Sequence, residues 1–287
     1  MTDLDQLAAA VERPDHEVRR SVTEQRDGAP AGRLGDLAVW LAGVQGRHPA
    51  SPPQRPRLLV LADRVPDRTA AVAADSAVEV SVAGLRSTGE LRVDVEDACS
   101  RDEALAAVLA GVALADQEAD AGTDLLVLAL PEPALAIPAA TLIGLLTRSD
   151  ASMVTATGQD DAAWMVACAA ARDAMRRGRP LLADQVALLA AVGGPDLAVA
   201  AGVLLQAAAR RTPVVLDGLV SGAAALVATR LSFRAPDWWL AGHVSPDPAH
   251  RLALARLSLE PLLDLGLRGD DATGALLAVP VLRAAVS

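Results

Sequence analysis

Three short aliphatic runs constrain the fold of this chain more than any other feature. Each run is apolar without a break, and they are RLLVLAD (57–63), DLLVLAL (124–130) and TPVVLDG (212–218). A strand that is apolar on both faces is typical of a parallel sheet buried between two layers of helices. Longer segments with helical patterning separate the runs, as the crossovers of such a sheet require. The sequence therefore predicts an α/β fold: a doubly wound, mostly parallel sheet flanked by helices.

Two further strands and a set of helices complete the expected order. The strands are LRVDVED (91–97) and DWWLAGH (237–243). One helix is expected to begin at Ser100, because Ser100 as N-cap and Glu103 three residues later form a capping box. Other helices are expected at 34–44, from Pro138, at 160–177, at 195–211 and at 221–231. We expect residues 1–50 to be the helical N-terminal segment of a smaller subdomain, to which the C-terminal end can add. Residues 56–287 are expected to form a Rossmann-like α/β domain.

The composition excludes several classes of function. The net charge is −10 and all 26 basic residues are Arg, so no lysine can form a Schiff base or hold a phosphate. An acidic chain without a basic stripe argues against binding to nucleic acid or to an anionic membrane surface. The two cysteines, Cys99 and Cys168, are isolated and provide neither a disulfide framework nor a zinc site. We expect no metal and no cofactor.

One segment imitates a membrane span. Residues 125–146 are almost entirely apolar, but Pro131, Pro133 and Pro138 interrupt them, whereas a spanning helix needs about 20 uninterrupted apolar residues. A strand, a proline turn and a buried helix fit the segment better, since Pro is favourable in the first turn of a helix. The acidic N-terminus has no signal-peptide pattern. The sequence therefore predicts a cytoplasmic protein that does not cross a membrane.

Candidate functional groups follow the expected strands, which is where ligands bind in parallel α/β sheets. They are Asp217 and Gly218 after TPVVL, His243 and Ser245 after WWLAG, and Asp270, Asp271, Thr273 and Gly274 in the turn LRGDDATG; Gly193 and Gly194 form a further glycine turn in VGGPDLA. Each group has a structural alternative. The two adjacent aspartates can cap the following helix, Asp-Gly is common in turns, and the segment GHVSPDPAH (242–250) can satisfy buried backbone groups instead of holding a metal.

Several stretches resemble the nicotinate-nucleotide:dimethylbenzimidazole phosphoribosyltransferase family. They are RDGAPAGRLGDLAVWLAGVQG (26–46), ADQEADAGTDLL (115–126), GQDDAAW (158–164), VGGPDLA (192–198) and the block 210–285. The resemblance implies a doubly wound α/β domain with a smaller helical domain, assembled as a homodimer. It also implies transfer of phosphoribose from nicotinate mononucleotide to a nitrogen of a benzimidazole-type base, a step of cobalamin synthesis, with these two molecules as partners.

The resemblance also assigns roles to single positions. Asp271 falls where the family has its catalytic glutamate, so it is the candidate base, although its side chain is one methylene shorter. The other strand-end groups named above are candidate substrate-binding residues. The family's phosphate loop carries glycines followed by Asn-Thr-Thr, and this chain has Leu135, Ala136 and Ile137 at those three positions. The family's lysine falls at Ala167.

A further departure follows the first strand. There the family has a long segment that begins with Gly-Asp-His-Gly and contacts the base. This chain continues from the strand into RVPDR (64–68), and the region that follows is shorter and has no aromatic residue that could stack on a benzimidazole.

Three interpretations follow from these departures. The chain can be a family member with impaired or altered catalysis that uses Asp271 as its base. It can be a non-catalytic homologue that acts as a dimer partner or regulator, paired with itself or with a full-length paralogue. Finally, it can be a small-molecule binding protein that uses the same cleft for a less charged ligand, since a lining of Pro, Ala and Leu suits an apolar compound.

Overall fold

A five-stranded parallel sheet organises the computed structural model of this chain, which describes residues 3–25, 32–85, 89–131, 133–155 and 160–286. The strand order is β2-β1-β3-β4-β5, and every neighbouring pair is parallel. The strands are β1 (Pro56–Val60), β2 (Glu79–Val82), β3 (Leu125–Ala129), β4 (Val214–Asp217) and β5 (Trp239–His243). The chain therefore has the expected α/β fold with a mostly parallel sheet flanked by helices.

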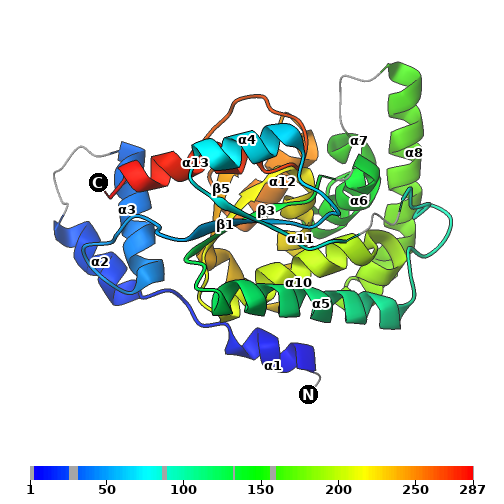
Figure 1. Ribbon diagram of the computed structural model, residues 1–287. Coiled ribbons are helices and arrows are strands. Elements are labelled where there is room, and N and C mark those ends of the chain that lie inside the picture. Colours follow the sequence, from blue (N-terminus) through cyan, green and yellow to red (C-terminus); the bar gives the residue numbers. More distant parts are fainter. Residues whose placement is uncertain (1–2, 26–31, 86–88, 132, 156–159, 287) are drawn as a thin grey trace.

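Helices cover both faces of the sheet, as the unbroken apolar strands require (Figure 1). In β3, Leu126 and Leu128 belong to the larger core, whereas Leu125 and Val127 belong to the core on the opposite face. The larger core contains residues of α5 (Arg101–Asp120), α6 (Ala136–Thr147), α10 (Pro195–Ala209), α11 (Gly218–Leu231) and α12 (Pro248–Leu257). The opposite core contains residues of α3 (Gly32–Gln45), α4 (Asp67–Asp75) and α13 (Thr273–Ala284).

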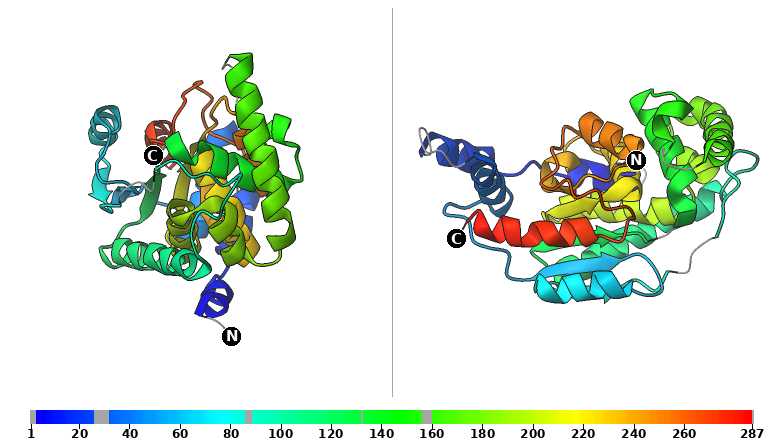
Figure 2. Two further views of the ribbon diagram at one scale, coloured as in Figure 1. Left: turned by 90° about the vertical axis from the view of Figure 1, so that its right-hand side faces the viewer. Right: turned by 90° about the horizontal axis from the view of Figure 1, so that it is seen from above.

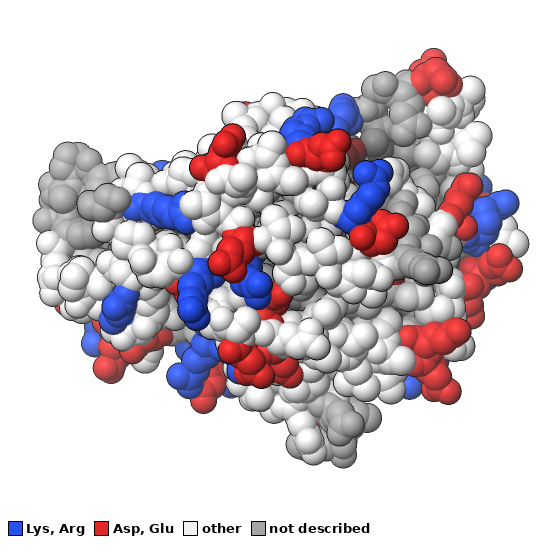
Figure 3. Space-filling view, viewed as in Figure 1, with Lys and Arg blue, Asp and Glu red and all other residues white. Residues whose placement is uncertain are grey.

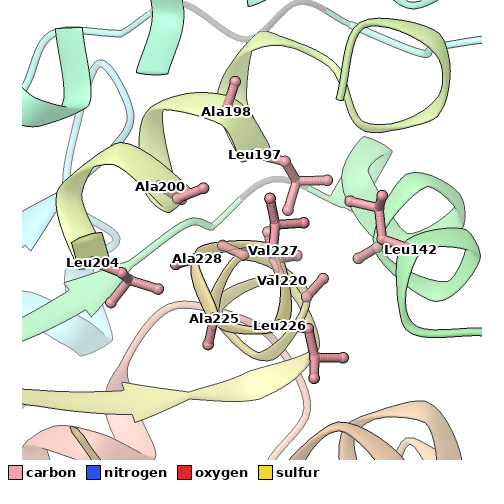
Figure 4. Packing of buried hydrophobic residues seen from close by; sticks show 14 of the residues in the cluster. Leu142, Leu197, Ala198, Ala200, Leu204, Val220, Ala225, Leu226, Val227 and Ala228 are labelled. Atoms are coloured by element: carbon pink, nitrogen blue, oxygen red, sulfur yellow. The ribbon is translucent and has the colours of Figure 1, made fainter. Parts of the chain in front are cut away.

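The larger core is aliphatic and its helices approach one another closely. Figure 4 shows Leu142 of α6 packed beside Leu197 of α10 and Val227 of α11. Two glycines allow α5 and α10 to touch along their backbones. A Cβ added at Gly111 would lie 2.0 Å from the carbonyl oxygen of Val199, and one at Gly202 would lie equally close to that of Val108. Small residues at this crossing therefore let the two helices meet at backbone distance.

The remaining helices lie at the ends of the molecule. In the first fifty residues, α1 (Asp3–Ala10) packs against α10, whereas α2 (His16–Gln25) packs against α3. The pair α2–α3 lies at one end of the molecule and α8 (Asp161–Gly178) at the other (Figures 1 and 2). Short elements complete the order: η1 (Pro133–Leu135), α7 (Ala151–Val154), η2 (Arg179–Leu181), α9 (Gln185–Leu188), a π-helical turn (Leu189–Gly193) and η4 (Ala235–Trp238).

Most of the expected elements are present, with one wrong strand. The capping box of Ser100 and Glu103 begins α5, and α6 begins two residues before Pro138. The strand expected at 91–97 is a turn instead, in which Arg92 O accepts hydrogen bonds from Val95 N and Glu96 N. Val93 is the one fully buried side chain of that segment. The segment therefore lacks the apolar face that a strand needs. The edge strand that pairs with β1 is β2, which lies upstream of the predicted strand.

The apolar segment at 125–146 contains β3 and α6, both within the globular core. Within the described residues, no helix combines the length and apolar character needed to cross a membrane.

Candidate functional site

A cavity of about 350 Å³ lies at the carboxyl ends of β3 and β4. Its walls are mostly apolar, and its charged groups come from the part of the chain after α11. The lining residues are Pro131, Pro133, Ala136, Ile137, Ala140, Val154, Thr155, Ala167, Leu219, Asp247, Arg268, Gly269, Asp270 and Asp271. A larger hollow of about 1110 Å³ adjoins this cleft and shares Pro133, Ala136, Ile137 and Ala167 with it. The site is therefore where parallel α/β sheets bind ligands.

Two of the three cleft aspartates, Asp270 and Asp271, come from one loop, residues 265–274, which we call the acid loop. It lies at the end of the orange-to-red trace that joins α12 to α13 in Figure 1. The carbonyl oxygen of Asp270 accepts a hydrogen bond from Leu130 N at 2.8 Å, just after β3. Its side-chain Oδ1 accepts one from Val220 N at 2.7 Å, in the first turn of α11. Asp270 therefore joins the acid loop to two neighbouring elements.

Burial of the side chain raises the pKa of Asp270 well above its usual value, and the nearby carboxylates of Asp217, Asp247 and Asp271 add to the increase. The hydrogen bond from Val220 N opposes this change by stabilising the charged form. Although the residue as a whole is half-buried, protein surrounds its carboxyl group. A carboxyl group with a raised pKa in a cleft is typical of sites that exchange protons.

Asp271, the predicted base, lines the same cleft and is half-buried. Its Oδ1 accepts a hydrogen bond from Thr273 N at 3.0 Å, so it also stabilises the start of α13 as the structural alternative proposed. The helix cap itself is Ala272, which has a positive φ of 63° and no capping side-chain hydrogen bond. The structure thus places Asp271 where a ligand can reach it.

Asp217 and His243 lie beneath the cleft and outside its lining. Asp217 is 3% exposed and His243 is 1% exposed. Asp217 Oδ2 accepts hydrogen bonds from Gly274 N at 2.9 Å and Ala275 N at 3.3 Å. Asp217 Oδ1 lies 3.3 Å from His243 Nδ1, and His243 Nε2 accepts a hydrogen bond from Leu265 N at 3.2 Å. Burial raises the pKa of Asp217, whereas the contact with His243 lowers it.

Two glycines of the predicted site permit close approaches around this pair. A Cβ added at Gly218, whose φ is 80°, would lie 2.2 Å from Asp270 Oδ1. A Cβ added at Gly274 would lie 2.5 Å from the Cβ and Cγ atoms of His243. These glycines therefore let the acid loop approach the ends of β4 and β5.

The segment before α12 divides between the core and the cleft. His250 is fully buried, and its Nδ1 accepts a hydrogen bond from Ser245 N at 3.0 Å. Burial lowers the pKa of His250 to about 3, so its ring is neutral. Asp247 instead lines the cleft, where burial raises its pKa and Arg268 lowers it. In the described part of the chain, no group of three or more His, Cys, Asp or Glu side chains could hold a metal ion.

The glycine turn of Gly193 and Gly194 does not reach the cleft lining. Gly193 ends the π-helical turn, and Gly194, with a φ of 88°, precedes α10. A Cβ added at Gly194 would lie 2.6 Å from Leu91 Cδ1. The turn is therefore packed against the segment around Leu91, and its predicted role in binding substrate stays a prediction.

Comparison with known proteins agrees with the fold described above. A family model described as "Phosphoribosyltransferase" matches residues 64–287. A nicotinate-nucleotide–dimethylbenzimidazole phosphoribosyltransferase of Streptomyces avermitilis is 45% identical, over 99% of this chain and 89% of that protein. This chain belongs to that family. A relative of the same name from Mycobacterium ulcerans is 41% identical, over 89% of this chain and 83% of its own length. The crystal structure of the Thermus thermophilus enzyme is 27% identical, with a TM-score of 0.87 over 95% of each chain.

This chain is shorter than the Streptomyces avermitilis relative. The alignment with the Streptomyces avermitilis relative runs over 335 positions, although this chain has 287 residues, so dozens of positions of the relative have no counterpart here. Of the three residues that the sequence resemblance matched to the family's Asn-Thr-Thr, Leu135 is buried, and Ala136 and Ile137 line the cleft with apolar side chains. Ala167, which the resemblance matched to the family's lysine, also lines the cleft.

Many arginines outside the 350 Å³ cleft form ion pairs with described carboxylates. Figure 3 shows acidic and basic side chains interspersed over one face, and many arginines form ion pairs, such as Arg57 with Glu118 and Arg210 with Asp116. Arg268 is exposed and, like several other arginines, forms no ion pair within 4 Å of a described carboxylate. It is the one cation among the described residues that line the 350 Å³ cleft, beside three aspartates.

Sequence reasoning missed Arg268, which follows the apolar run PLLDLGL and was noted only as part of a motif. It also missed that Asp247 faces the cleft. The sequence contained one signal for Arg268 and Asp247, namely their position beside elements that end at the carboxyl edge of the sheet.

Proposed function

We propose that this chain carries out an altered form of the family reaction, in which the cleft binds a benzimidazole-type base well and the phosphate of nicotinate mononucleotide poorly. The observation that supports this proposal is the pairing of apolar cleft walls with three aspartates and a single exposed arginine. A flat heteroaromatic base suits the apolar walls, and its N–H can donate to a carboxylate. A phosphate dianion meets repulsion from the aspartates.

The chemistry assigned to the acid loop is proton acceptance during N-glycosyl transfer. The unprotonated ring nitrogen of the base attacks C1′ of the ribose, and the bond from C1′ to the nicotinate nitrogen breaks. Its electron pair returns to the pyridine ring, which leaves as neutral-ring nicotinate. The N–H proton of the attacking base passes to a carboxylate, for which we assign Asp271 because of its place in the cleft. Asp270 holds the loop in position through Val220 N.

The donor is expected to bind weakly through Arg268. In the family resemblance, glycines, hydroxyl groups and a lysine receive the phosphate, and apolar side chains occupy several of those positions here. The adjoining hollow does not compensate. Its charged lining residues are Glu90, Arg92, Asp94, Asp160 and Asp173, which sum to a negative charge. Productive turnover should therefore need high concentrations of nicotinate mononucleotide.

The test is calorimetry of the two substrates separately, followed by mass spectrometry of their mixture. We expect dimethylbenzimidazole to bind at micromolar concentration, nicotinate mononucleotide to bind at millimolar concentration, and a ribazole phosphate product that Asp271→Asn abolishes. Binding of neither substrate, from a folded protein, would contradict the proposal. Binding of the base without any product would favour the alternative of a small-molecule binding protein.

A second function is supported by a different feature, the exposed apolar side chains at the end of the molecule formed by α7 and α8. Met153, Met165 and Val166 are 55%, 59% and 71% exposed. Exposed clusters of this kind mark protein interfaces. We therefore keep the alternative of a dimer partner, either of a second copy or of a full-length paralogue. Light scattering after gel filtration tests it: a monomer at all concentrations, alone and with a paralogue, would exclude this role.

A further inference from the structure

The acid loop is held at both ends by the same buried pair of side chains. On the side where the loop begins, His243 Nε2 accepts a hydrogen bond from Leu265 N. On the side where it ends, Asp217 Oδ2 accepts hydrogen bonds from Gly274 N and Ala275 N. The two side chains face each other, with 3.3 Å between His243 Nδ1 and Asp217 Oδ1. The strands β4 and β5 that carry them are neighbours in the sheet.

The hydrogen bonds determine the protonation of this pair. Because His243 Nε2 accepts from Leu265 N, that nitrogen carries no proton, and the neutral ring carries its proton on Nδ1. Asp217 Oδ1 lies 3.3 Å from this nitrogen, in a contact without hydrogen-bond geometry, and has no other hydrogen-bond partner among the described residues. The two backbone hydrogen bonds to Oδ2 and the imidazole beside Oδ1 favour the carboxylate form, against the burial that raises the pKa of Asp217. The tautomer with its proton on Nδ1 leaves Nε2 free to accept from Leu265 N, and it is also the tautomer that the contact with Asp217 favours.

Burial separates the pair from any ligand. Neither side chain lines the cleft, and both are nearly inaccessible to solvent. A direct contact with a substrate is thus excluded in this arrangement. An effect of Asp217 or His243 on the reaction must pass through the acid loop, which contains Arg268, Asp270 and Asp271 between the two tethered ends.

We propose that Asp217 and His243 form a single positioning unit that fixes both ends of the acid loop and thereby sets where its carboxylates face the cleft. The inference rests on the function proposed above for its catalytic consequence, whereas its structural part can be tested without activity. One consequence follows only if Asp217 and His243 act together and not if each has a separate structural role. A change at Asp217 should release Leu265, which Asp217 does not contact, because it changes the tautomer of His243.

Asp217→Asn and His243→Gln test this coupling. In Asp217→Asn the amide oxygen can still accept from Gly274 N, but the amide nitrogen then faces Nδ1 and favours the tautomer with a proton on Nε2. That tautomer cannot accept from Leu265 N. In His243→Gln the terminal oxygen can replace Nε2 as acceptor, so Leu265 keeps its bond while the donor to Asp217 is lost. Ser221→Ala is the matched control, because Ser221 is buried nearby and bonds Asp217 O but no residue of the acid loop.

Hydrogen exchange of single backbone amides by NMR is the first measurement. We expect the exchange of Leu265 N–H to become roughly tenfold faster in Asp217→Asn, as for the loss of one hydrogen bond. It should change little in His243→Gln and in Ser221→Ala. The ¹⁵N shifts of the His243 ring should show an Nδ1–H tautomer in the wild-type protein and an Nε2–H tautomer in Asp217→Asn. An unchanged tautomer with unchanged Leu265 exchange in folded Asp217→Asn would overturn the proposal.

Turnover is the second measurement, and it separates this inference from the proposed function. With saturating dimethylbenzimidazole and nicotinate mononucleotide, Asp217→Asn should lower product formation at least tenfold while Ser221→Ala does not. His243→Gln should restore part of the rate relative to His243→Ala, since it keeps one tether. No product from wild-type protein, with the exchange pattern as expected, would contradict the proposed function alone. Normal turnover in Asp217→Asn would contradict the positioning unit alone.

Discussion

Asp270 and Asp271 are adjacent in the chain but bind different parts of the fold. Asp270 Oδ1 accepts a hydrogen bond from Val220 N of α11, a residue fifty positions earlier in the sequence. Asp271 Oδ1 accepts its hydrogen bond from Thr273 N, two positions later. One carboxylate therefore anchors the acid loop to the body of the protein, and the other remains in the cleft with a local turn contact only. Two neighbouring residues of the same type should thus respond differently to the same substitution.

The first prediction compares these two residues in catalysis. Asp271→Asn should reduce formation of ribazole phosphate by about a hundredfold or more, because it removes the proton acceptor. Asp270→Asn should reduce it far less, since the amide oxygen can still accept from Val220 N. Rates measured by mass spectrometry at saturating substrates would distinguish them. Equal losses in both variants would show that the two carboxylates act as one group.

The second prediction concerns the stability of the protein as a function of pH. The folded-state pKa of Asp270 is raised by burial, so the folded state favours its protonated form. Its contribution to stability is therefore fully present at low pH, below its unfolded pKa, and is lost as the pH rises through the folded pKa. Asp270→Asn should remove this loss and stabilise the protein at neutral pH relative to wild type. Urea denaturation at a series of pH values measures the effect.

Asp264 provides the control for Asp270, because its pKa is shifted in the opposite direction in the folded protein. Arg251 donates a hydrogen bond to Asp264 and thereby lowers the pKa of that exposed carboxyl group. Asp264→Asn should therefore alter stability only by removing a contribution that is present above the unfolded pKa and lost as the pH falls. If Asp270→Asn gave the same pH profile as Asp264→Asn, the raised pKa of Asp270 would be contradicted.

The third prediction concerns His250, whose folded pKa of about 3 lies far below the usual value for histidine. Because the folded pKa is depressed, the stability contributed by the neutral ring is present above about pH 6.5 and is lost as the pH falls toward 3. The slope should approach about 1.4 kcal/mol for each pH unit within that window. His250→Asn keeps an acceptor for Ser245 N and should flatten this part of the profile. A ring that NMR shows to be protonated in the folded protein at pH 5 would contradict the prediction.

Much of the fold could be predicted because its signal is local. Uninterrupted apolar runs such as 57–63 and 124–130 indicated β1 and β3, and a capping box indicated the start of α5. The edge strand β2 was missed because it lacks that signal: Glu79, Val80 and Val82 are exposed. Segment 91–97 has alternating apolar residues yet forms a turn, since only Val93 among them is fully buried. Edge strands and turns depend on tertiary contacts that a local pattern does not contain.

The location of the candidate site could be predicted, but which of its residues face the cleft could not. The ends of β4 and β5 and the acid loop follow from the topology rule for parallel sheets. The sequence could not show that Asp217 and His243 turn inward while Asp247 and Arg268 face the cleft. In the sheet, the pairing of β4 with β5 shifts register between Leu216 and Asp217, and Asp217 lies beside His243. The position of a register shift depends on the pairing of the whole sheet, so no local sequence pattern indicates it.

The fourth prediction concerns the crossing of α5 and α10. Gly202→Ala should destabilise the protein by about 1–3 kcal/mol or more, because the added Cβ would meet the backbone of Val108 and the helices would have to separate. Gly144→Ala is the control: its Cβ would meet the Sδ and Cε atoms at the end of the flexible Met175 side chain, each at 2.9 Å. Thermal or urea denaturation should show a clearly larger loss for Gly202→Ala. Comparable losses for the two variants would mean that the helix contact is not the tight one described.

The fifth prediction tests the reason for weak donor binding. Ala136→Thr with Ile137→Thr would place two hydroxyl groups in the first turn of α6, where the side chains at both positions line the cleft. Hydroxyl donors beside a helix N-terminus favour an anion, so the double variant should bind nicotinate mononucleotide at least tenfold more tightly by calorimetry. Nicotinate riboside, which lacks the phosphate, is the matched ligand and should bind the variant and the wild type equally. A gain for both ligands would place the new contacts on the ribose or the nicotinate ring, and no gain for either would mean that the apolar residues of α6 are not what limits phosphate binding.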